Sequence, residues 1–231
     1  MMLTALCRAF YALSKPPLRR IVALSLALAV LTFALLWLAV GSVLYNTAFF
    51  EWRPLNWLAD LMGGLTVVAL SWLLFPAVVT LIMSLFLERV AAAVEALDYP
   101  GNGPPRRQSI RETLEAMLRL TALTLLLNLL ALPAYLLLPG INLFLFLALN
   151  GYLLGREYFE MVALRRLDAA ATRAARNRFG LRVFLGGVVI AALFALPLVN
   201  LAAPVIATAF MLHVFEALSR VGPHPLTRST V

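Results

Sequence analysis

Two long apolar runs constrain this chain more than any other feature. The first covers residues 21–50 and the second 55–87, and only a short turn at 51–54 separates them. Each run exceeds the roughly 20 helical residues that cross a hydrocarbon core about 30 Å thick, so both helices should tilt or protrude. We therefore predict two long transmembrane helices over 21–50 and 55–97, the second of which continues beyond the membrane.

The composition supports one membrane domain over residues 1–231. The chain is 63% hydrophobic and 13% charged, whereas soluble domains are about half apolar and a quarter charged. A net charge of +8 would suit nucleic acid, but membrane proteins commonly carry excess Lys and Arg in cytoplasmic loops. We therefore expect no nucleic-acid partner. The first apolar run is also longer than the roughly 7–15 residues of a signal-peptide core, which indicates a retained helix.

An amphipathic helix is predicted before the first long run, over residues 3–15. One face is apolar, formed by Leu3, Leu6, Phe10 and Leu13. This pattern is typical of a helix that lies in the membrane interface. The Lys15-Pro16-Pro17 sequence should end it, because proline lacks a backbone donor and restricts the residue before it.

The remaining apolar segments form two pairs of arms, over 110–168 and 179–220, and each pair turns at an uncharged, proline-rich apex. The arms that follow the apices, 140–155 and 204–215, would reach only about 24 and 18 Å as helices. A full crossing needs about 20 residues, so we predict two re-entrant helical hairpins inserted from one side. Six full spans are the alternative. The predicted fold class is thus an all-α integral membrane protein.

The distribution of positive charge predicts the orientation. Of the 19 Lys and Arg residues, only Arg53 lies on the side of the turn between the long helices. The positive-inside rule places the other side in the cytoplasm. Both termini, including a tail at 221–231, and the bases of both hairpins should therefore be cytoplasmic.

No enzyme signature is visible in the sequence. It lacks a metal-ligand spacing, a glycine-rich phosphate loop and a nucleophile motif. We predict no catalytic residue, no metal site and no cofactor, and we do not expect an enzyme.

The first candidate site is the start of the first long helix, at Leu18, Arg19 and Arg20. A helix N-terminus has free N–H groups and a partial positive charge, and both favour an anion. Two adjacent arginines add forked donors that suit an oxyanion. We predict an oxyanion site at the cytoplasmic interface. The alternative is a topology signal that binds lipid phosphate.

The second candidate is a polar route along the hairpin apices. Gly140 and Asn142 lie at the first apex, and Asn200 lies at the second. These residues are predicted to line a possible pathway for a solute. Helix capping by the asparagines is the alternative.

The third candidate is a polar cluster on the helix that leaves the membrane after the first apex, formed by Asn150, Arg156, Glu157, Glu160 and Arg165. Arg156 and Glu160 are four residues apart, so an ion pair along one helix face is expected. We interpret the cluster as a structural clamp at the hairpin base. The alternative is a solvated helix end.

Several segments carry a family resemblance. NGYLLGREYFEMVALRR at 150–166, with LPGIN before it, PLVNLAAPVIA after it and PPLRRIV near the N-terminus, resembles the CysZ-type sulfate permease family, also called the etoposide-induced-protein domain family. The resemblance implies a bacterial inner-membrane protein with two long spans and two re-entrant hairpins, which admits sulfate for cysteine biosynthesis. It also implies anion binding near Leu18, Arg19 and Arg20. Pro17 replaces the family's glycine there, which removes one backbone donor.

The predicted function is an inner-membrane permease or channel-like transporter for sulfate or a related small oxyanion. Membrane lipids and further copies of the chain are the expected partners, because half-inserted hairpins need neighbours to cover their apices. The alternatives are a non-transporting scaffold that binds anionic lipid, and an assembly or stress factor.

Overall fold

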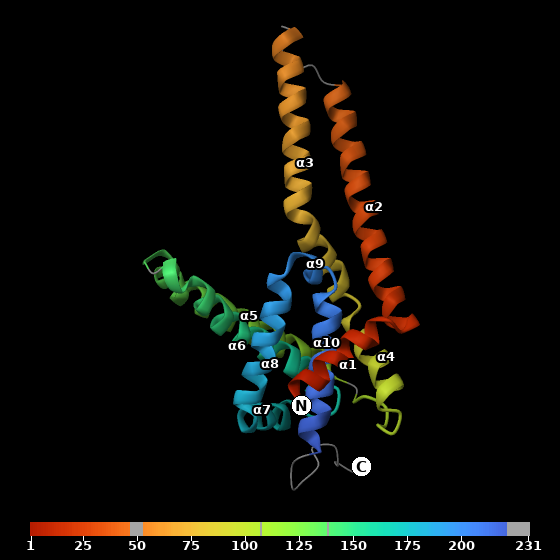
Figure 1. The fold of residues 1–231 in the computed structure, drawn as a ribbon, viewed down its shortest axis with the longest axis vertical. Coiled ribbons are helices and arrows are strands. Elements are labelled where there is room, and N and C mark those ends of the chain that lie inside the picture. The colour runs from red at the N-terminus through yellow and green to blue at the C-terminus, as the bar shows by residue number, and fades with distance from the viewer. Residues whose placement is uncertain (47–52, 107, 138, 221–231) are drawn as a thin grey trace.

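The computed structural model describes residues 1–46, 53–106, 108–137 and 139–220 (Figure 1). Every element of secondary structure in these ranges is a helix, which confirms the predicted all-α class. The predicted end of the first long helix at residue 50 and the predicted tail at 221–231 lie outside the described residues.

The two longest helices form an extended antiparallel pair, α2 (Pro16–Asn46) and α3 (Arg53–Ser84) (Figure 1). Trp37 Nε1 donates a hydrogen bond to Ser71 Oγ at 2.8 Å, and the rings of Phe33 and Phe75 pack 5.6 Å apart. The outer faces of both helices are apolar and exposed, and both helices are long and apolar enough to cross a membrane.

Both long helices differ from their predicted bounds. Helix α2 begins at Pro16 rather than at residue 21, because proline is well suited to the first helical positions, where no N–H is needed. The single helix predicted over 55–97 is interrupted at Leu85 and Phe86. There the amides turn back to carbonyls three residues earlier, at 3.2 and 2.9 Å, which tightens the chain and ends α3. A separate helix, α4 (Leu87–Asp98), follows.

Two helical hairpins complete the chain, joined by α7 (Ala169–Arg178). The first consists of α5 (Ile110–Leu137), η1 (Pro139–Ile141) and α6 (Asn142–Ala163), and the second of α8 (Gly180–Ala195), α9 (Pro197–Asn200) and α10 (Ala203–Ser219). Within the described ranges α5 is a third helix long and apolar enough to span a membrane, and α7 and α8 meet at 88°. Re-entry of the hairpins stays a prediction.

Helix α10 is the core of the molecule. Almost all its side chains are buried, because α1 (Met2–Leu13), α4, α6 and α8 surround it. A helix that is apolar all round is expected in such a position. Helix α1 packs across it through Ala5, Ala9 and Ala12, and this leaves Leu3 and Phe10 exposed. Of the face predicted to lie in the membrane interface, Leu3 and Phe10 thus point outward, whereas Leu6 and Leu13 are partly buried against the core.

Helices α6 and α8 approach so closely that their backbones touch. A Cβ atom on Gly187 would lie 1.8 Å from the carbonyl oxygen of Gly151 and 2.5 Å from the amide of Gly155. The small residues are spaced four apart on α6, as in helix pairs that pack at short distance. This contact fixes the polar end of α6 next to α7 and the start of α8.

The elements at one end of the molecule each carry or border at least one arginine, and α7 carries three. Helices α1, α4 and α7 and the C-terminal end of α10 lie there, opposite the tips of α2 and α3 (Figure 1). The separation of charge along the sequence is thus also a separation in space, as a common membrane side requires.

Candidate functional site

The start of α2 has one buried leucine followed by two exposed arginines. The Leu18 side chain is fully buried, whereas Arg19 and Arg20 are exposed and have no ion-pair partner among the described residues. Lys15, just before the helix, donates a hydrogen bond to Tyr11 OH at 3.1 Å. Positive charge is therefore concentrated where α1 meets α2.

Few backbone donors accompany these arginines. Pro16 and Pro17 have no N–H, and the amide of Arg19 donates to Lys15 O at 3.0 Å. Only the Leu18 amide of this first turn is left for a ligand. The prediction counted both backbone amides and arginines as donors to an anion. Because so few amides are free, an anion here would depend mainly on the two guanidinium groups.

The predicted pathway residues lie at two separate apices. Gly140 is in η1, Asn142 begins α6 and Asn200 ends α9, and the two apices lie apart in Figure 1. Neither α6 nor the helix after Asn200 has a side-chain cap, so the capping alternative is not observed. The amide oxygens of Asn142 and Asn200 are buried without a hydrogen-bond partner in the described chain. A single copy does not bring the two together.

The five residues of the predicted polar cluster on α6 do not form one cluster in the structure. Arg156 Nε donates to Glu160 Oε1 at 2.9 Å, which confirms that ion pair. Glu157 is exposed and has no ion pair within the described ranges, and Asn150 Nδ2 donates to a carbonyl of its own helix, at 2.9 Å. Arg165 belongs to a second cluster.

Arg165 connects the end of α6 to α4. Its side chain is only 2% exposed, and it pairs with Glu95 at 2.6 Å and with Glu88. Arg166 pairs with the same Glu95 at 3.0 Å. These contacts support the clamp interpretation for Arg165, although the predicted partners did not include α4.

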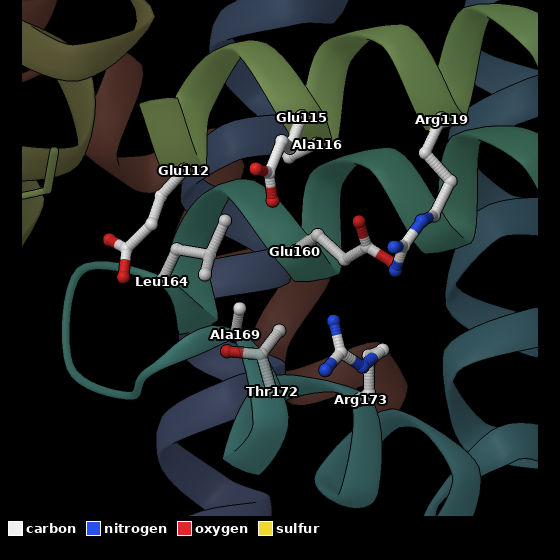
Figure 2. Close-up of a pocket in the computed structure, with 9 residues that line it drawn as sticks. All are labelled: Glu112, Glu115, Ala116, Arg119, Glu160, Leu164, Ala169, Thr172 and Arg173. Atoms are coloured by element: carbon white, nitrogen blue, oxygen red, sulfur yellow. The ribbon is translucent and has the colours of Figure 1, made fainter. Parts of the chain in front are cut away.

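Sequence reasoning missed three arginines around Glu160. Arg176 of α7 pairs with Glu160 Oε1. Arg119 of α5 and Arg173 of α7 line a small cavity of about 50 Å³ together with Glu160, and Figure 2 shows both side chains directed toward its carboxylate. Arg173 and Arg176 are three residues apart and so share one helix face. This spacing was the one feature of the sequence that could have indicated a basic face on α7.

A second buried cluster was also missed, at the base of α10. Tyr99 OH hydrogen-bonds His213 Nδ1 at 2.7 Å, and Asn102 Nδ2 donates to Glu216 Oε1 at 2.7 Å. Burial raises the pKa of Tyr99, and the negative charge of Glu216 adds to the effect. Both pairs join residues 114 positions apart, so no local pattern could have predicted them.

Comparison with known families gives one match. Residues 5–204 match the model of the family described as sulfate transporter CysZ/etoposide-induced protein 2.4. The chain belongs to this CysZ/etoposide-induced family. The predicted resemblance is thereby confirmed, and the family is one of transporters. No curated protein and no solved structure matches the chain.

Every site residue predicted from the sequence lies within the region that matches the CysZ/etoposide-induced family. The match includes the arginines at the start of α2, both hairpin apices and the surroundings of Glu160. It stops at residue 204, one residue after α10 begins. The family match therefore covers the elements that carry the candidate sites, while most of the core helix lies beyond it.

Proposed function

We propose that this protein is a membrane permease that passes sulfate, or a related small oxyanion, into the cytoplasm. The observation that carries the proposal is the family match over residues 5–204. Three helices long and apolar enough to span a membrane supply the membrane setting. Arginine side chains at one end of the molecule supply the donors that a tetrahedral oxyanion needs.

Arg19 and Arg20 are the residues proposed to receive the anion. They are exposed, adjacent and free of ion-pair partners in the described structure, so their donors remain available. The proposed location is the bacterial inner membrane with this end in the cytoplasm, and the charge distribution supports that orientation. Homo-oligomers are part of the proposal, because Asn142 and Asn200 need more than one copy to border a shared channel-like route.

Sulfate flux into proteoliposomes tests the permease. Purified wild-type protein should pass sulfate above empty vesicles, and Arg19→Ala/Arg20→Ala should reduce the flux at least tenfold, because about 1.4 kcal/mol of anion stabilisation corresponds to a factor of ten. Arg89→Ala/Arg111→Ala is the matched control, since it removes equal charge from two exposed positions. A folded wild-type protein that passes no sulfate would refute the proposal.

A lipid-binding scaffold is the second candidate function. The prolines at the start of α2 remove backbone donors for a small anion, and exposed Leu3 and Phe10 lie on the adjacent α1. This combination also suits a headgroup phosphate beside a membrane surface. The same variants separate the two: a scaffold would show no sulfate flux, and loss of Arg19 and Arg20 would weaken binding to vesicles with anionic lipid.

A further inference from the structure

Glu160 is the centre of an arginine-rich basin at the base of the first hairpin. Arg156 and Arg176 both contact its Oε1 atom, one from the preceding turn of α6 and one from α7. The side chains of Arg156, Glu160 and Arg176 are only 10%, 14% and 19% exposed. Two largely buried positive charges thus share one carboxylate, and the trio keeps a net positive charge.

Two further arginines increase this excess. Arg119 and Arg173 approach Glu160 from α5 and α7, as Figure 2 shows. The other acidic residues that line the same small cavity already have partners: Glu112 pairs with an arginine before α5 at 2.8 Å, and Glu115 pairs with another on α5 at 2.8 Å. Glu160 is therefore paired with two arginines, and two more line the same small cavity.

The opposite side of the Arg156–Arg176 pair borders a larger cavity. Its volume is about 290 Å³, and Tyr152, Asn177 and Gly180 also line it. A guanidinium group has five N–H donors, and the bonds to Glu160 use one nitrogen of each arginine. An oxyanion that enters this cavity would first meet the remaining donors and the polar groups of Tyr152 and Asn177, next to the bonds that Glu160 now makes.

We propose that this basin is a second oxyanion site, in which Glu160 holds the arginines as a tethered carboxylate that an incoming tetrahedral oxyanion displaces. The proposal rests on the proposed permease function for the identity of the ligand. A carboxylate and an oxyanion are alternative partners for the same forked donors. An oxyanion also suits the site electrically, since Arg156 and Arg176 both line the larger cavity and their two positive charges exceed the single charge of Glu160.

The mechanism predicts opposite effects for the acid and its arginines. Glu160→Gln removes the competing charge, so sulfate should bind about tenfold more tightly, given the strength of a like-charge interaction a few ångströms away. Arg176→Gln and Arg156→Gln should weaken binding by a similar factor. A purely structural ion pair would not produce an increase, because loss of either partner would only destabilise the hairpin base.

The test is equilibrium binding of radiolabelled sulfate to the purified full-length protein. The variants are made in the Arg19→Ala/Arg20→Ala background, so that the site at α2 does not contribute. Arg178→Gln is the matched control, because Arg178 is an exposed residue of the same helix and lines neither cavity. Thermal unfolding of each variant accompanies the binding curves.

Tighter binding by Glu160→Gln together with weaker binding by Arg176→Gln, and no change in Arg178→Gln, supports the second site. Unchanged sulfate affinity in all variants overturns it, as does a uniform loss that follows the unfolding temperature. Flux of sulfate through wild-type vesicles is measured in parallel. If flux is absent but the opposite shifts occur, the permease function fails and the site stands. If flux is normal and the shifts are absent, only the site fails.

Discussion

The contact between α6 and α8 should tolerate no side chain at Gly187. A Cβ atom there would lie 1.8 Å from Gly151 O, 2.5 Å from Gly155 N and 2.6 Å from Gly155 Cα. All three are backbone atoms, so no side-chain rotation can relieve the overlap. Ordinary carbon–oxygen contacts are about 3.3 Å or longer, so the helices would have to separate by about 1.5 Å at the crossing.

The cost of Gly187→Ala should lie at the upper end of overpacking penalties, about 3 kcal/mol. For a chain of this size that corresponds to a fall in the unfolding temperature of roughly 6–12 °C. Thermal unfolding of the detergent-purified protein measures it. Gly186→Ala is the control, because the nearest atoms to its Cβ would be side-chain atoms, the flexible end of Met211 at 3.3 Å and the Phe210 ring at 3.7 Å. Because alanine favours the helix over glycine by about 1 kcal/mol, Gly186→Ala should change the unfolding temperature little.

The order of the four glycine variants tests the reasoning further. Gly155→Ala should also be severe, since its Cβ would lie 2.5 Å from the carbonyl oxygen of Val183. Gly151→Ala should be milder, because its closest contact, at 2.6 Å, is a side-chain methyl group of Val188. Equal unfolding temperatures for Gly187→Ala and Gly186→Ala would refute the close crossing. If Gly187→Ala yields no folded protein, the ranking of the other three still decides.

Two further predictions concern the polar clusters. Arg165→Ala should destabilise the protein by about 1.5–3 kcal/mol, because it removes charged hydrogen bonds to the nearly buried Glu95, which keeps Arg166 as a partner. Arg111→Ala breaks an exposed pair and should leave the unfolding temperature almost unchanged. Unfolding temperatures compare the two variants, and equal values would contradict the buried pairing. Tyr99→Phe should cost about 1–3 kcal/mol through the lost hydrogen bond to His213. Because the pKa of Tyr99 is raised in the fold, its contribution is complete below its ordinary pKa of about 10 and is lost as pH rises through the raised value. The stability difference between wild type and Tyr99→Phe should therefore shrink above that pH.

The long helices were predictable because their signal is local and strong. An apolar run of thirty residues has few structures available to it other than a membrane helix. The break at Leu85 and Phe86 was not predictable, since neither proline nor glycine marks it. The short turn there allows α4 to change direction and pack on α10, and such a tertiary cause leaves no trace in a local window.

The glycine crossing shows a different limit. Gly151 and Gly155 have the spacing of a close helix contact, and that spacing is visible in the sequence. Their partner is Gly187, more than thirty residues later, and many small residues of the chain could have served. Pattern alone indicates that a helix will approach closely, but only the three-dimensional arrangement identifies which helix does so.

The candidate sites show the same contrast between contacts within one helix, which the sequence predicts, and contacts between distant segments, which it does not. The ion pair of Arg156 and Glu160 was predictable, because residues four apart on a helix are neighbours. Counting charge could not show that Arg176 adds a second positive partner to the same oxygen, or that Arg165 instead neutralises acids on α4. The chemical difference between these arginines comes from their partners. Arg165 pairs with two carboxylates of α4, the nearly buried Glu95 and the exposed Glu88, whereas the group around Glu160 keeps donors in excess. An anion can compete only where such an excess exists, so the functional distinction depends on pairing in three dimensions and not on the number of basic residues.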